Sequence, residues 1–183
     1  MNPSDEELVL RFRGGDESAF EAMVARWNEP ILQLATRITG DLEEAKDIRQ
    51  MALIKTYQGI AGFEGRSRFS TWIYRVVLNL CRDRKRGEAV RTRVEGSVRE
   101  KEGDYLLEET GFHVARDREL AQIVARAVLE LPASEREVVV LRHYHELPFP
   151  TIAEILGSPV TTVKSRMSRG LTLLRARLAA LET

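Results

Sequence analysis

The sequence predicts an all-α protein with two small helical domains joined by a flexible linker. Apolar residues recur at helical spacing in both halves of the 183-residue chain. Residues 89–115 lose this periodicity and carry dense charge with few apolar side chains, which is typical of a linker. The last segment contains two apolar-striped helices separated by a tight turn. We therefore expect domains at residues 1–88 and 116–183.

The composition excludes a membrane protein and does not exclude a nucleic-acid-binding protein. The chain is 43% apolar and 31% charged, with a formal net charge of zero. Its charges are segregated, because basic residues gather at 66–93 and 164–177. Local charge matters more than the sum when a surface meets DNA. The acidic N-terminus is unlike a secretory signal and no apolar run spans a bilayer, so we expect a cytoplasmic protein without membrane insertion.

Two amphipathic helices are expected between residues 4 and 33, with a break at Gly14-Gly15. Ser4 and Glu7 have the spacing of a capping box, and Pro30 fits the start of a further helical segment.

The next helix is expected to begin at Asp41, whose carboxylate can cap it, and to run to about Tyr57, which would face inward. Its periodicity leaves one polar face and does not distinguish a partner-binding face from a solvated one. That polar face carries Lys46, Asp47, Arg49, Gln50 and Lys55.

A glycine-rich break at residues 59–68 precedes another helix, for which Ser70 or Thr71 is the expected cap. Trp72 lies between an apolar arc and a basic arc of this helix. Aromatic rings beside arginines suit single-stranded nucleic acid, because bases stack on rings and cations bind phosphates. Periodicity fits a plain core role for Phe63 and Trp72 equally well. The basic arc consists of Arg75, Asn79, Arg82 and Arg86, and Cys81 near the apolar arc is expected to be buried.

The second helical unit is expected to start near Arg116, with Leu120 opening its apolar stripe. Ser134 and Glu137 resemble another capping box. Residues 138–141 are consecutive apolar residues that also fit a strand, and the flanking cap signals favour a helix.

Residues 148–177 predict a helix-turn-helix whose second helix is the recognition helix. Gly157 suits a left-handed C-terminal cap, Ser158 is expected to cap the second helix, and Pro159 to take its first position. One face of that helix is an apolar stripe. The opposite face carries hydroxyls and cations that can meet base edges and phosphates, namely Thr161, Lys164, Ser165, Arg166, Ser168, Arg169 and Thr172.

Together these segments resemble a bacterial sigma factor of the extracytoplasmic-function type, in the sigma-70 superfamily. EEAKDIRQMALIKTY is similar to region 2.2, FEGRSRFSTWIYRVVLNLCRDRKR to regions 2.3 and 2.4, and LPASEREVVVLRHYHELPFPTIAEILGSPVTTVKSRMSRGLTLLRARL to region 4. The resemblance covers nearly the whole chain outside the linker. Arg66 and Glu64 depart from residues frequent in the family, which leaves promoter preference open.

The resemblance implies a protein that binds RNA polymerase core enzyme through its β and β′ subunits, directs it to promoters and helps melt the DNA. It implies an anti-sigma factor as a further partner, a role in stress or envelope response, and no catalytic residue, metal or cofactor. The helix after Asp41 would dock on the β′ clamp helices through Asp47, Arg49 and Gln50.

The resemblance also implies two DNA-binding sets. The loop at residues 63–68, with Asn79 behind it, would capture a base flipped from the −10 element. The −35 set is Thr161, Lys164, Ser165, Arg166 and Arg169, and the −10 set is Phe63, Arg66, Arg68, Trp72, Arg75, Asn79, Arg82 and Arg86.

Two other functions fit parts of the sequence. A free-standing helix-turn-helix regulator would need self-association to bind two half-sites, and it leaves the aromatic loop and the linker unexplained. An enzyme would have to use His113, His143, His145 and Cys81, but His143 and His145 point apart on a helix, which disfavours joint metal binding.

Overall fold

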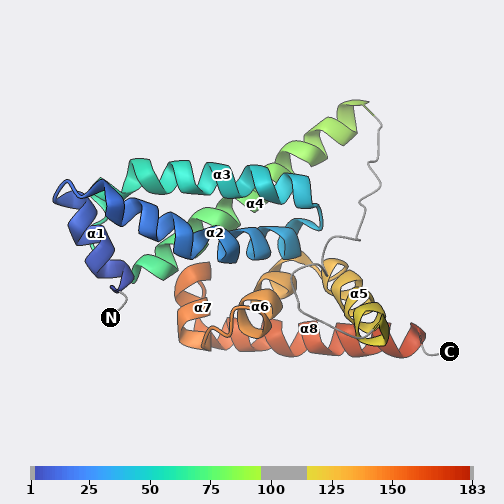
Figure 1. The fold of residues 1–183 in the computed structure, drawn as a ribbon. Coiled ribbons are helices and arrows are strands. Elements are labelled where there is room, and N and C mark those ends of the chain that lie inside the picture. The colour runs from blue at the N-terminus through green and yellow to red at the C-terminus, as the bar shows by residue number, and fades with distance from the viewer. Residues whose placement is uncertain (1–2, 96–114, 182–183) are drawn as a thin grey trace.

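The computed structural model describes residues 3–95 and 115–181, and the all-α prediction is confirmed for them. Figure 1 shows two groups of helices in contact, which we call the N-terminal half and the C-terminal half. The N-terminal half contains α1 (Asp5–Arg13), α2 (Glu17–Thr39), α3 (Leu42–Gly59), a short 3-10 turn η1 (Ile60–Gly62) and α4 (Phe69–Glu95). The C-terminal half contains α5 (Ala115–Leu129), α6 (Ala133–His143), α7 (Phe149–Leu156) and α8 (Val160–Leu181).

The start of the chain follows its local signals closely. The Ser4–Glu7 capping box is confirmed, since Ser4 N donates to Glu7 Oε2 at 2.6 Å and Glu7 N donates to Ser4 Oγ at 3.2 Å. The predicted break between α1 and α2 is also confirmed. Pro30, in contrast, begins no new segment and lies inside α2. Buried Trp27 and Ile31 on either side of it hold the helix against one core, which offsets the missing hydrogen bond.

Helix α3 begins as predicted, because Asp41 Oδ1 accepts a hydrogen bond from Glu44 N at 2.9 Å. The inward orientation predicted for Tyr57 is wrong, since this residue is 51% exposed. Its ring packs instead against Phe12 and Phe20, with centroids 5.5 and 5.0 Å away. Tyr57 therefore closes the edge of the α1–α2–α3 core rather than entering it.

Helix α4 differs from its prediction at both ends. It begins at Phe69, so neither Ser70 nor Thr71 caps it, and Arg68 O accepts the hydrogen bond from Trp72 N at 3.2 Å. Phe69 is fully buried, and this tertiary anchor replaces the expected side-chain cap. The helix also continues past residue 88 to Glu95. Cys81 is buried as predicted, and burial raises the pKa of its thiol to about 12.

Residues 138–141 lie in helix α6, as predicted, but the Ser134–Glu137 capping box is wrong. Pro132 takes the N-cap position without a side-chain hydrogen bond, and the Ser134 hydroxyl donates to Glu135 Oε2 at 2.6 Å. Glu137 reaches across to the N-terminal half and pairs with Arg82. A long-range partner has therefore displaced a local one.

The predicted apolar stripe on α5 is shorter than expected. Its buried positions begin at Ala125, so Leu120 lies short of the core and is 60% exposed. Val128 near the end of the helix is buried as predicted, and so is Leu131, which lies two residues past the helix end.

Helices α7 and α8 form the predicted helix-turn-helix. Gly157 ends α7 with a φ of 60°, in the left-handed region that glycine adopts without strain. The predicted cap at Ser158 is wrong, because its hydroxyl donates back to Leu156 O at 3.4 Å and Val163 N bonds to Pro159 O at 3.1 Å. The helix therefore starts one residue later than expected, at Val160.

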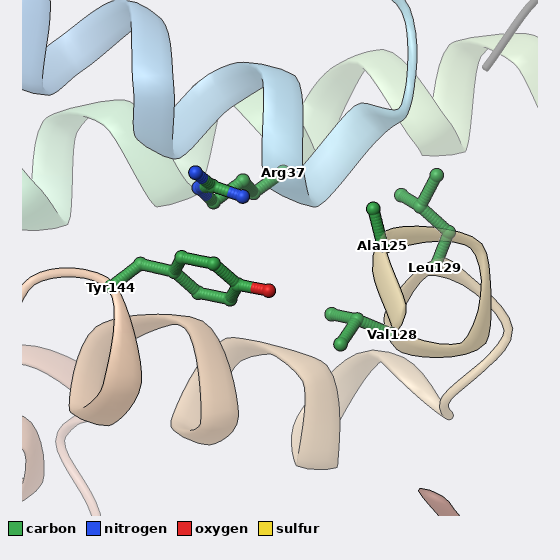
Figure 2. A pocket seen from close by; sticks show the side chains of 5 residues that line it. All are labelled: Arg37, Ala125, Val128, Leu129 and Tyr144. Carbon is green, nitrogen blue, oxygen red and sulfur yellow. The ribbon is translucent and has the colours of Figure 1, made fainter. Parts of the chain in front are cut away.

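The two halves meet where α2 and α4 face α5, α6 and α7 (Figure 1). The Arg37 guanidinium lies 3.6 Å from the centre of the Tyr144 ring, and these two residues line a small pocket in Figure 2. At the end of α2, Gly40 has a φ of 78°, and a Cβ there would lie 2.8 Å from Leu129 Cδ1. This close approach requires glycine.

Candidate nucleic-acid interface

Helix α8 presents to solvent the face that is predicted to contact DNA, which we call the reading face. It carries Thr161, Lys164, Ser165, Arg166, Ser168, Arg169 and Thr172. Lys164 and Ser165 are exposed, and Arg169 retains 72% of its side-chain exposure. On the opposite side, Val163 and Met167 are buried. The helix-turn-helix therefore buries its apolar stripe against α6 and α7 and leaves Lys164, Ser165 and Arg169 exposed, where a groove of DNA can reach them.

Contacts within the C-terminal half orient the reading face. Arg169 Nε lies 3.6 Å from Glu135 Oε1, and Arg166 Nη1 donates to Ser158 Oγ at 3.5 Å. Gly170, one residue after Arg169, lets α8 cross α6 closely, since a Cβ there would meet Val139 Cγ2 at 3.0 Å. This close packing on α6 sets the orientation of α8 and therefore the direction in which the reading face points.

The aromatic residues of the second predicted site form a cluster at the edge of the N-terminal core. The Phe63 ring lies 5.9 Å from that of Phe69 and 5.6 Å from that of Trp72, between ring centroids. Trp72 packs over Gly59, where a Cβ would meet the indole at 2.9 Å. Phe63 and Trp72 remain partly exposed. They therefore anchor the loop and still offer part of a stacking surface.

The tip of that loop is exposed and polar. Arg66 retains 86% of its side-chain exposure and pairs with Glu64 at 2.6 Å, while Gly65 turns the chain with a φ of 70°. Arg68 is exposed as well. A solvated ion pair of this kind is weak, so Arg66 is free to exchange its partner for a phosphate.

The basic arc of α4 is divided between solvent and the C-terminal half. Asn79 is exposed, and Arg86 retains 76% of its side-chain exposure. Arg75 Nε instead donates to Glu154 O of α7 at 3.1 Å, and Arg82 pairs with Glu137 of α6. The structure therefore does not present the predicted −10 set as one open surface.

The polar face of α3 is accessible and includes apolar residues that the sequence analysis missed. Asp47 retains 62% of its side-chain exposure beside Arg84, 3.2 Å away, and Gln50 is exposed. Met51 and Ile54 are 44% and 43% exposed. Their spacing from Asp47 places them on the same side of the helix, and this spacing was a signal available in the sequence. Such a mixed patch is typical of a protein-binding surface.

No group of three or more potential metal ligands occurs among the described residues, and His113 lies outside them. His143 is exposed. His145 instead points into the contact between the halves, where its Nδ1 lies 3.1 Å from the Tyr74 hydroxyl. Burial, and next the Arg37 guanidinium, lower the pKa of His145 to about 4.

The lowered pKa of His145 predicts an acid-sensitive stability. Between its ordinary pKa of 6.5 and about 4, the unfolded chain binds more protons than the folded chain. The free energy of unfolding should therefore fall as the pH falls through this window, by up to about 1.4 kcal/mol per pH unit from this residue. Urea unfolding of wild type and His145→Gln between pH 4 and 7 measures the difference. Parallel stability curves for the two proteins would contradict the prediction.

Comparison with known proteins gives matches over both halves. Residues 23–91 match the family model of Sigma-70 region 2, and residues 121–174 match that of Sigma-70 region 4. The chain is 35% identical over 182 residues to the ECF RNA polymerase sigma factor SigW of Bacillus subtilis, covering 94% of this chain and 96% of that protein. It is 32% identical over 174 residues to the ECF RNA polymerase sigma-E factor of Escherichia coli K12, covering 91% and 90% of the two chains.

Solved structures match the fold of both halves together. CnrH in complex with the cytosolic domain of CnrY matches with a TM-score of 0.73 and 26% identity, covering 97% of this chain and 99% of that one. The sigma factor RpoE of Bartonella quintana, in complex with the anti-sigma factor NepR, matches with a TM-score of 0.75 and 20% identity over 87% and 96% of the chains. None of the helices in the described part of this chain is long and apolar enough to cross a membrane.

Proposed function

Because this chain belongs to the ECF family of sigma-70-type RNA polymerase sigma factors, we propose that three of its surfaces have separate roles in transcription initiation. Helix α3 would bind the polymerase, α8 the −35 element, and α4 with the loop before it the −10 element. The family assignment makes the protein a sigma factor and not an enzyme. It also accounts for the N-terminal half, which a free-standing helix-turn-helix regulator leaves unexplained. Two observations carry the proposal together: α8 has an exposed, cationic face, and α3 has a separate accessible face in the other half.

We assign polymerase docking to α3. Asp47 and Gln50 supply polar contacts there, and Met51 and Ile54 supply apolar area that a partner can bury. Arg49 is half-buried and lies across the helix from Asp47, so it would contact the partner only from the edge of the patch. A small apolar centre inside a polar rim is the usual anatomy of a protein interface. We propose that the β′ clamp of the polymerase is the surface that covers it, while the β subunit contacts the C-terminal half.

We assign the −35 element to α8, which would lie in the major groove of duplex DNA. Lys164 and Arg169 are the exposed cations on its face, and Ser165 lies between them. Thr161 is exposed at the N-terminal end of the helix, and Arg166 at its edge is half-buried. Phosphate contacts from the cations would fix the register, and the side chains that reach base edges would set the sequence preference.

We assign the −10 element to the loop at residues 63–68 and to α4. A base that leaves the stack would be held beside Phe63 and Trp72, with Asn79 supplying hydrogen bonds to its edge. Unstacking costs a few kcal/mol, which a stacking and hydrogen-bonding pocket offsets. The exposed cations Arg66, Arg68 and Arg86 would bind phosphates of the separated strand.

Asn79→Ala tests the assignment of strand opening. The substitution is expected to reduce promoter opening about tenfold, because hydrogen bonds to a base edge are worth 1–3 kcal/mol, and to leave polymerase binding unchanged. A fluorescent base analogue in the −10 element reports opening, and titration of labelled protein with core enzyme reports binding. Asn28→Ala removes the same amide from α2 and is the control. Equal losses of opening and binding by Asn79→Ala would contradict the assignment.

We further propose that the protein acts in the cytoplasm, where RNA polymerase works, and in a stress or envelope response. The relatives whose structures carry an anti-sigma factor or a cytosolic partner domain support an anti-sigma factor as its inhibitor. Co-purification with the product of a neighbouring gene, followed by loss of transcription when the two are mixed, tests this partner.

A further inference from the structure

Helix α1 contacts both ends of the loop at residues 63–68. At one end, Arg13 Nη1 donates a hydrogen bond to the main-chain oxygen of Phe63 at 3.3 Å. At the other end, Glu6 Oε1 accepts a hydrogen bond from Phe69 N, also at 3.3 Å. Phe63 is the first residue of the loop, and Phe69 is the first residue of α4, directly after the loop. Two side chains of one short helix therefore bind the loop where it begins and where it ends.

The hydrogen bond from Arg13 completes the pairing of the Phe63 main chain. Phe63 N donates to Ile60 O at 3.2 Å, so both polar main-chain groups of Phe63 have partners. The Phe63 ring packs against Phe69 and Trp72 and remains partly exposed. Because the main chain is fixed at this point, the ring offers its stacking surface in a defined orientation.

The hydrogen bond to Glu6 supplies the cap that α4 lacks in its own sequence. The first N–H groups of a helix have no partner within the helix, and a carboxylate there also meets the positive end of the helix dipole. Ser70 and Thr71 do not cap α4, and the Glu6 carboxylate takes this position from another helix. Phe69 is fully buried, so an unpaired N–H there would be costly. Glu6 therefore helps to set where α4, which carries Asn79, begins.

Helix α1 is itself fixed on the N-terminal core. Arg26 of α2 pairs with Asp5 at 2.5 Å and donates to Pro3 O at 2.6 Å. Leu8 and Val9 of α1 are buried, and α1 packs on α2, η1 and α4. The support therefore runs from the core of this half, through α1, to both ends of the loop.

We propose that Glu6 and Arg13 are positioning residues, which keep the loop in the conformation that receives the base flipped from the −10 element. This proposal rests on the −10 assignment made above. Both residues precede the segment 23–91 that matches Sigma-70 region 2. They act through the main chain of Phe63 and the start of α4, and they need not touch the DNA. Their loss should therefore impair base capture more than phosphate binding.

Polymerase holoenzyme assembled with the wild type or with each variant tests the proposal. The probes are labelled single strands from the −10 region of a promoter that the wild-type holoenzyme transcribes, and fluorescence anisotropy measures their binding. In a matched set of strands, an abasic site replaces each base in turn. The position with the largest loss of wild-type affinity identifies the captured base. The ratio of the dissociation constants of the abasic and intact strands at that position measures base capture.

The ratio for the wild type should be about 100, since stacking and hydrogen bonds to the base edge are each worth about tenfold. Glu6→Ala combined with Arg13→Ala is expected to lower this ratio about tenfold, because two surface hydrogen bonds to charged groups are lost. Binding of the abasic strand should stay nearly unchanged. A loss of stability alone would weaken binding of both strands by the same factor and would leave the ratio unchanged.

Conservative variants and a matched control complete the set. Glu6→Gln keeps an acceptor oxygen and Arg13→Lys keeps a cationic donor, so these two substitutions together should retain most of the ratio. Arg11→Ala removes an arginine from the same end of α1, where it pairs with Asp16 at 2.7 Å, and should leave the ratio at its wild-type value. If the double alanine variant does not assemble with core enzyme, Glu6→Ala and Arg13→Ala give the same comparison singly.

The outcomes separate this proposal from the −10 assignment. If the wild-type ratio is large and the alanine variants keep it, or lose affinity equally for both strands, α1 does not position the loop and the −10 assignment stands. An equal fall of the ratio from Arg11→Ala would also overturn the roles of Glu6 and Arg13. If no abasic site weakens binding by the wild-type holoenzyme, the −10 assignment is wrong, and the proposed role of α1 is wrong with it.

Discussion

The double substitution Met51→Asp and Ile54→Asp is expected to weaken binding to RNA polymerase core enzyme by about 100-fold or more. Burial of each apolar side chain in an interface is worth about 1.5–3 kcal/mol, and a carboxylate placed there adds the cost of burying a charge. Both residues are more than two-fifths exposed in the free chain, at 44% and 43%. Their replacement should therefore leave the fold and its thermal stability nearly unchanged.

Titration of labelled protein with core enzyme measures this loss, and circular dichroism verifies the fold. Leu10→Asp is the control, because Leu10 is 66% exposed on α1 and lies outside the α3 face. An equal loss from Leu10→Asp would indicate that exposed apolar area in general drives the binding. Full affinity of the double variant would exclude α3 as the docking helix.

The second large effect concerns the reading face of α8. Lys164→Ala combined with Arg169→Ala is expected to weaken binding to a duplex carrying the −35 element about 10- to 100-fold at physiological salt. Each lost phosphate contact should also make the negative slope of log K against log salt concentration shallower by about 0.9. Neither side chain is part of the core. Lys164 is exposed, and Arg169 is 72% exposed and forms an ion pair with Glu135 at 3.6 Å.

Anisotropy of a labelled duplex, titrated at several salt concentrations, gives both the affinity and the slope. Lys55→Ala is the control, because it removes one exposed positive charge from α3, far from the reading face along the chain. A weakened affinity with an unchanged salt slope would mean that the two cations do not contact phosphates. A similar effect from Lys55→Ala would mean that binding depends on the overall charge of the protein and not on the reading face.

Local signals in the sequence predicted most of the fold. The capping residues Ser4 and Asp41 and the turn residue Gly157 act within four residues of themselves, and the structure confirms all three. The predictions fail where a distant partner decides. Glu137 leaves its expected local cap for Arg82, 55 positions away in sequence, and buried Phe69 replaces the expected cap of α4.

The site could be predicted in part for the same reason. The face of α8 follows from helical spacing, because the stripe opposite it is buried in its own half. Docking of the two halves has no periodic signature, so spacing could not show that Arg75 and Arg82 face α7 and α6. Exposed apolar Met51 and Ile54 were missed because apolar positions on an amphipathic helix are ordinarily assigned to the core.

Run-off transcription with purified core polymerase and a library of promoter fragments tests the central claim most directly. Adding this protein should produce transcripts that start at a defined subset of promoters, and those promoters should share −10 and −35 sequences. Core enzyme alone should produce none of them. The absence of any promoter-specific transcript, together with no binding of the protein to core enzyme in the same samples, would contradict the account.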